Sequence, residues 1–218
     1  MQNTKEIKIG NIYIGSSHPI AIQSMTNTVT KDVLKTVKQI NDLAKIGCHI
    51  VRVAVLDMDD ALAIKEIKKH ISIPLVADIH FDYKLAIAAI EAGCDKIRIN
   101  PGNIGSIDRV EAVVNGCREN GTAMRIGVNS GSLPKELAEK VDRKEISREE
   151  ALVETAAREC SVFEDLKFDQ YAVSMKASSV EETILCNESF AKKYDVPLHI
   201  GVTEAGPLIG GIVKSSIA

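Results

Sequence analysis

The feature that most constrains the fold is a repeated alternation between short β-branched runs and longer segments of helical periodicity. Seven runs are present, beginning near Ile20, Ile50, Leu75, Lys96, Met124, Gln170 and Leu198. Successive starts are mostly about 20 to 30 residues apart, which suits one strand, one helix and two short loops. The pattern predicts βα units around a parallel sheet, either an open doubly wound sheet or a closed barrel.

Residues that begin and end helices support this division. The spacing of Ser147 to Glu150, and of Ser178 to Glu181, is that of a capping box at a helix start. Three glycines stand where helices should end, each shortly before a predicted strand: Gly47, Gly93 and Gly121.

Two segments depart from the regular repeat. The polar stretch 130–148 lengthens the fifth unit and is predicted to be an active-site loop or lid. Before the first strand, isoleucines at positions 7, 9, 12 and 14 flank Gly10-Asn11, a two-residue turn typical of a β-hairpin. We expect this hairpin to cap the bottom of the barrel.

Cationic residues interrupt the apolar strands near their carboxyl ends, where parallel barrels build their active sites. They are Arg52, Arg98, Arg125 and Lys176. Strand alternation places Arg98 on one face with Asn100, and Arg125 on one face with Gly127 and Asn129. The intervening apolar residues then face the helices.

A lone arginine in such a place is as often a structural ion pair as a ligand-binding residue, but four cations need more compensation than the sequence offers. Only two strand-end carboxylates are available, Asp78 and Glu204. A buried cation without a partner is costly, so a ligand with at least two negative charges is predicted, and a diphosphate suits three guanidinium groups best. No glycine-rich phosphate loop of the open-sheet type is present, which favours the barrel.

Three residues are candidates for proton transfer. Asp78 and His80 share one strand face, which fits an acid/base pair, half of a metal site or structural hydrogen bonding. Proton transfer or substrate contact is the favoured interpretation, and no metal is expected. Glu204 follows the seventh strand among small residues, so we predict an acid/base role for it as well.

The composition argues against proteins that bind nucleic acids or membranes through their net charge. With 27 basic and 30 acidic residues and a net charge of -3, the chain has no cationic field for nucleic acid or an anionic membrane. No secretion signal or membrane span is recognisable, so we expect a cytoplasmic protein, with residues 1–218 forming one domain. The five cysteines are odd in number and widely spaced, which favours reduced, packed thiols over disulfides or cluster ligands.

Several longer motifs carry a family resemblance. They include Ile-Gln-Ser-Met-Thr-Asn-Thr, Ala-Asp-Ile-His-Phe, Ile-Arg-Ile-Asn-Pro-Gly-Asn-Ile-Gly, Arg-Ile-Gly-Val-Asn-Ser-Gly-Ser-Leu, Ser-Met-Lys-Ala-Ser and His-Ile-Gly-Val-Thr-Glu-Ala-Gly. In this order they closely resemble the 4-hydroxy-3-methylbut-2-enyl diphosphate synthase family of the non-mevalonate isoprenoid pathway, and the likeness covers essentially the whole chain.

The resemblance implies a TIM-type (β/α)8 barrel that takes part in the reductive opening of 2-C-methyl-D-erythritol 2,4-cyclodiphosphate. It implies that the diphosphate is bound by Arg52, Arg98, Arg125 and Lys176. It further implies a pocket lined by Asp78, His80, Asn100 and Asn129, with Glu204 as the acid/base group.

The family also carries a C-terminal domain in which three cysteines and a glutamate hold a [4Fe-4S] cluster. Flavodoxin or ferredoxin supplies its electrons, and in the family's homodimer this domain covers the partner's barrel. The 218 residues show no such domain and no eighth strand. We therefore expect a truncated barrel of about seven strands that binds the diphosphate, holds no cofactor and does not turn over alone.

Three other interpretations stay open. A class I aldolase would use Lys176 as a Schiff-base nucleophile. A dihydropteroate synthase-like transferase would place similar Asp, Asn, Lys and Arg residues at its strand ends. A binding module without catalysis would need only the four cations.

Overall fold

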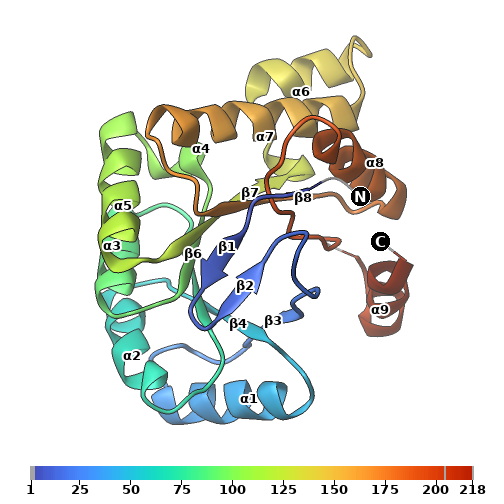
Figure 1. The fold of residues 1–218 in the computed structure, drawn as a ribbon. Coiled ribbons are helices and arrows are strands. Elements are labelled where there is room, and N and C mark those ends of the chain that lie inside the picture. The colour runs from blue at the N-terminus through green and yellow to red at the C-terminus, as the bar shows by residue number, and fades with distance from the viewer. Residues whose placement is uncertain (1–2, 204, 218) are drawn as a thin grey trace.

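A six-stranded parallel sheet forms the centre of the molecule in the computed structural model, which describes residues 3–203 and 205–217. The strands are β3 (Gln23–Met25), β4 (Ile50–Ala54), β5 (Leu75–Asp78), β6 (Lys96–Ile99), β7 (Ala123–Asn129) and β8 (Tyr171–Lys176). Each strand pairs with the next one in sequence, and Figure 1 shows the sheet curled with helices around its outer side. The predicted barrel architecture is confirmed, and within the described ranges no ladder joins β3 to β8.

Helices follow the strands as the repeat predicts. They are α1 (Val33–Lys45), α2 (Met58–Lys68), α3 (Tyr83–Glu91), α4 (Pro101–Ile104), α5 (Ile107–Asn120), α6 (Lys135–Asp142), α7 (Arg148–Asp165), α8 (Val180–Ala191) and α9 (Leu208–Ile217). The three predicted stop glycines have the positive φ angles that favour glycine, and all three follow the last residue of a helix.

One predicted helix start is confirmed and the other is wrong by one residue. The capping box of Ser147 and Glu150 opens α7, with both reciprocal hydrogen bonds present. At α8 the cap is Ser179, whose side chain accepts from the Glu182 backbone nitrogen. Two adjacent serines are each followed three residues later by a glutamate, so spacing alone does not distinguish them.

The seventh predicted strand is reduced to a single parallel bridge between Val173 and Leu198. Two backbone bonds hold this segment beside β8, from Val173 N to Pro197 O at 3.0 Å and from His199 N to Val173 O at 2.8 Å. Proline donates no ladder hydrogen bond, which weakens a strand at this point. The expectation of seven strands is therefore corrected to six strands and a bridge.

The predicted loop at 130–148 contains more regular structure than expected. It holds a short 3-10 turn, Ser130–Ser132, and the helix α6. Leu137 of α6 is fully buried, and Glu136 pairs with Arg158 of α7 at 2.5 Å. The description as a simple loop or lid is corrected accordingly.

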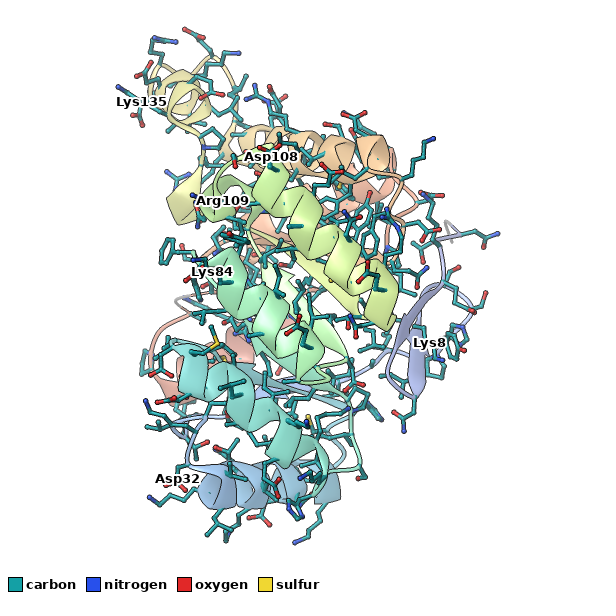
Figure 2. The ribbon with its side chains drawn as sticks, turned by 90° about the vertical axis from the view of Figure 1, so that its left-hand side faces the viewer. Lys8, Asp32, Lys84, Asp108, Arg109 and Lys135 are labelled. Atoms are coloured by element: carbon teal, nitrogen blue, oxygen red, sulfur yellow. The ribbon has the colours of Figure 1, made fainter. Side chains whose placement is uncertain are left out.

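The N-terminal hairpin closes the bottom of the sheet, as predicted. Strands β1 (Ile7–Ile9) and β2 (Ile12–Ile14) pair antiparallel around Gly10, whose φ is 59°. Ile7 and Ile9 are buried in a small apolar cluster with the first inward residues of four strands: Ile50, Val76, Ala123 and Ala172. Figure 2 shows the hairpin, marked by Lys8, at the end opposite to the starts of α3 and α5, marked by Lys84 and Arg109.

The main core lies between the outer face of the sheet and the helices. Strand residues such as Ile97 and Ile126 are completely buried there with helix residues such as Ile64 and Phe163. Ile99 and Val128 also belong to this core, so the predicted alternation is confirmed. The side chains between these core residues on each strand therefore point to the inside of the curled sheet.

Candidate functional site

Inward residues of neighbouring strands form a cationic layer inside the curled sheet. Arg98 on β6 pairs in register with Asp78 on β5 and with Arg125 on β7. Arg98 and Arg125 are 6% and 2% exposed, and Arg52 on β4 is partly buried. Lys176 ends β8 opposite Asn129. The structure thus brings together the four cations that the sequence predicted.

Asp78 lies at the centre of this layer. Its Oδ1 is 3.2 Å from Nη1 of Arg98, and its Oδ2 is 3.7 Å from Nε of Arg52. The same Oδ2 lies 3.5 Å from Nε2 of His80. A single carboxylate therefore serves two guanidinium groups and an imidazole. Nη2 of Arg52 also lies 3.0 Å from the sulfur of Met25, which is a weak acceptor.

Arg125 is buried without an ion pair among the described residues. Its Nε and Nη1 have no hydrogen-bond partner, and neither does Nε of Arg98. Burial is the largest of the causes that lower the pKa of Arg125 to about 9. The charges of Arg52 and Arg98 act in the same direction, and the carboxylate of Asp78 opposes them. Unsatisfied buried guanidinium donors are costly, and this layer holds three of them in the described part of the chain.

Two glycines lie beside the cationic side chains, and the first of them leaves space for a guanidinium. A Cβ atom at Gly127 would lie 2.7 Å from Nε of Arg98, so the guanidinium occupies the place of a side chain on β7. A Cβ at Gly201 would lie 3.4 Å from Nζ of Lys176. Burial lowers the pKa of Lys176 to about 7, helped by the charges of the three arginines. Part of its population is therefore a neutral amine near neutral pH.

His80 lies at the rim of the layer, with its side chain 48% exposed. Both ring nitrogens are 3.3 Å from Nη1 of Arg98, so the guanidinium lies against the imidazole. Asn100 caps α4, and its Oδ1 accepts from the Gly102 backbone nitrogen at 3.1 Å. It therefore has a structural role besides the predicted pocket-lining one.

Glu204, the predicted acid/base residue, lies outside the described residues. Thr203, the residue before it, is held by a backbone hydrogen bond: its nitrogen donates to Ala177 O at 3.1 Å. This bond keeps the backbone of Thr203 beside the end of β8, next to Lys176.

Sequence reasoning missed two polar residues of the interior. Lys96 opens β6, is 2% exposed, and has a pKa of about 7 because of burial and the charges of Arg125 and Arg52. Strand alternation from Arg98 would have found it. His199 follows the bridge at Leu198, and burial, together with the charges of Arg125, Lys176 and Lys96, holds its pKa far below the usual range. Its imidazole is neutral.

A metal or cluster site does not form among the residues that the structure describes, since no three His, Cys, Asp or Glu side chains gather there. The five cysteines are all buried and unpaired; three lie in the helices α5, α7 and α8, and two lie in the loops after α1 and α3. Of the described helices, none has both the length and the apolar character required to cross a bilayer.

Solved structures share the fold at low sequence identity. The chain resembles 3-dehydroquinate dehydratase from Geobacillus kaustophilus with a TM-score of 0.65 and 16% identity, over 98% of this chain and 83% of that one. It resembles 7,8-dihydropteroate synthase from Vibrio fischeri with a TM-score of 0.61 and 12% identity, over 98% and 88%. These likenesses concern the barrel alone.

Sequence relatives are much closer. The chain is 54% identical to proteins named 4-hydroxy-3-methylbut-2-en-1-yl diphosphate synthase (flavodoxin) from Caldicellulosiruptor saccharolyticus and Clostridium perfringens, over 99% of its own length and 61% of theirs. It is 53% identical to the protein of that name from Bacillus subtilis, over 98% and 56%. The chain thus spans about three fifths of these relatives. Residues 4–218 match the GcpE TIM-barrel domain, and the chain belongs to that family.

Proposed function

We propose that this barrel domain binds 2-C-methyl-D-erythritol 2,4-cyclodiphosphate and holds it while the ring is reductively opened to 4-hydroxy-3-methylbut-2-enyl diphosphate. The observation that carries the proposal is the buried guanidinium of Arg125, whose Nε and Nη1 have no partner. Arg52, Arg98 and Lys176 converge on the same layer. The names of the relatives supply the product.

The excess of positive charge suits this chemistry. A cyclic diphosphate diester carries two negative charges, about one on each phosphorus, and cleavage of one carbon–oxygen bond leaves a third on the released end. Cations fixed before the reaction stabilise that new charge without reorganising, which favours the transition state over the bound substrate. The loss of water consumes a proton, which a nearby acid must supply.

The titratable side chains have three different roles under this proposal. Asp78 is 5% exposed and contacts Arg52, Arg98 and His80, so it positions them. His80 is half exposed at the rim and is free to contact the substrate. Glu204 remains the proposed proton donor on the grounds of its sequence position. Asn100 and Asn129 are proposed to line the pocket.

Electron supply belongs to the proposal as well. Flavodoxin appears in the names of the relatives, and we propose it or ferredoxin as the donor, with a [4Fe-4S] cluster and a homodimer as the family resemblance implies. The described cysteines do not fit such a cluster, because they are buried at separate places, three in different helices and two in the loops after α1 and α3. We therefore assign this chain only the binding, positioning and protonation of the diphosphate ester.

Calorimetric titration of Arg125→Met with the cyclodiphosphate tests the proposal. A charge-assisted bond to phosphate contributes about 1.5 to 3 kcal/mol, so the affinity should fall by about tenfold to about 150-fold. Arg143→Met is the matched control, since Arg143 is exposed and pairs with Glu145 on the surface. Equal affinities for wild type and Arg125→Met would make Arg125 a structural residue and remove the basis for the diphosphate site.

One observation favours a second candidate function. The lowered pKa of Lys176 makes its amine a potential nucleophile toward a carbonyl substrate, as in a Schiff-base lyase. Borohydride reduction in the presence of a small phosphorylated aldehyde or ketone would trap such an adduct on Lys176. A stable adduct seen by mass spectrometry would favour the lyase, and its absence together with cyclodiphosphate binding would favour the synthase.

A further inference from the structure

Lys96 is a buried cation that the proposed function does not yet use. It opens β6 and lies on the same strand face as Arg98, two residues before it. Its Cα partners are Val76 on β5 and Ala123 on β7, which both belong to the apolar cluster under the hairpin. Lys96 therefore lies between the hairpin cap and the arginine layer, on the inner side of the proposed binding site.

The contacts of Lys96 leave its charge uncompensated. Among the described residues, its one hydrogen-bond partner is Oε1 of Gln23, at 3.1 Å, and no carboxylate pairs with it. The charged groups that act on it are Arg52 from β4 and Arg125 from β7. His199, which follows β8, is close enough for Lys96 to affect its titration. A neutral side chain would bond to Gln23 equally well, so that bond does not explain a lysine here.

We propose that Lys96, held by Gln23, is a fifth cation of the anion pocket and contributes its charge to the binding of a multiply negative ligand. This inference rests on the proposed function for the identity of the ligand. Its physical basis is that a cation buried under two arginines is unfavourable in the empty pocket and becomes favourable when an anion neutralises that layer.

A proton uptake follows from this arrangement. With a pKa of about 7 in the empty pocket, Lys96 is partly neutral near neutral pH, and a bound anion raises its pKa and draws a proton from solvent. Because the anion binds more tightly when Lys96 is protonated, its affinity falls as the pH rises through the pKa that Lys96 has without the anion. One such lysine makes the affinity fall by about tenfold between roughly pH 6 and roughly pH 8.

The test compares wild type with Lys96→Met and Lys96→Arg by calorimetry across this pH range, with the cyclodiphosphate as probe, because its diester charges stay constant there. Lys96→Met should bind about tenfold or more weakly at the acid end, and the ratio of wild-type to variant affinity should shrink by about tenfold toward the alkaline end. Lys96→Arg keeps a permanent charge, so it should bind well without this extra pH dependence. Lys8→Met, on the exposed face of the hairpin, is the control.

Two results would overturn the inference: a Lys96→Met variant with wild-type affinity at every pH, or one that binds more weakly with the wild-type pH dependence. If Lys96→Met does not fold, as judged by thermal melting, Lys96→Gln replaces it. If wild type does not bind the cyclodiphosphate at all, the proposed function fails. The same series with inorganic pyrophosphate then tests Lys96 separately, since the probe's own ionisation is common to all variants.

Discussion

At the scale of single residues, the site depends on a missing side chain as much as on charges. Gly127 leaves the space in which the Arg98 guanidinium lies, and Arg98 from this place reaches Asp78 at 3.2 Å. The backbone of β7 is paired on both sides, to β6 and to β8, so it has little freedom to move away. A Cβ atom at position 127 would therefore force the Arg98 guanidinium to move.

Gly127→Ala should therefore displace Arg98 and weaken its contact with Asp78. We expect a loss of about 1 to 3 kcal/mol in unfolding free energy from overpacking, and an affinity for the cyclodiphosphate at least about fivefold lower. Urea unfolding and calorimetry measure the two effects. Gly131→Ala is the control, because a Cβ there meets nothing within 4 Å. Wild-type affinity in Gly127→Ala would show that Arg98 does not bind the ligand.

Glu204→Gln tests proton transfer at the one predicted site residue outside the described part of the chain. The amide keeps the size and removes the titration, so turnover should fall by about 10²-fold to about 10⁴-fold in the whole enzyme with reduced flavodoxin. Binding should change little, because the cations still hold the diphosphate. Turnover near that of wild type would transfer the role to His80.

Much of the site was predictable from strand alternation, because a residue's parity determines its face. Arg98 and Arg125 were assigned in this way, and the structure brings them together on neighbouring strands. The role of Asn100 as a helix cap depends on backbone geometry after β6, which no spacing rule describes.

At the scale of elements, the start of α7 shows how strongly a local signal defines a helix. Ser147 accepts from the Glu150 nitrogen at 3.2 Å, and Glu150 accepts from the Ser147 nitrogen at 2.8 Å. Ser147→Ala should lower the unfolding free energy by about 1 kcal/mol. Ser106→Ala is a close control, since Ser106 precedes α5 without a side-chain cap bond. Equal losses in denaturant unfolding would show that the cap bonds contribute nothing.

Element types were easier to predict than element limits. The helices and the hairpin follow from periodicity and glycine positions, whereas β3 is only three residues long and the strand near Leu198 is a bridge. Strand length depends on partners from other parts of the chain. Ile20 and Ile22 look like strand residues in sequence, yet they are 91% and 58% exposed in the described structure.

At the scale of the whole molecule, the positions of the cysteines predict whether this chain can bind an iron–sulfur cluster. The cysteines lie in α5, α7 and α8 and after α1 and α3, and burial raises the pKa of Cys117 and Cys160 to about 12. Thiolates are the ligands of iron–sulfur clusters. Anaerobic reconstitution with iron and sulfide should therefore leave this chain colourless. Stoichiometric bound iron with visible absorption would contradict the assignment.

The N-terminal hairpin has a consequence for how the chain folds. Its contacts are distant in sequence: Lys8 N bonds to Gln170 Oε1, 162 residues later, and Lys5 N bonds to Asp195 O. A two-stranded hairpin is barely stable alone, and the closure of so long a loop is slow. We therefore expect the hairpin to dock after the folding barrier has been crossed. Ile9→Ala should accelerate unfolding and leave the refolding rate almost unchanged, as stopped-flow kinetics would show.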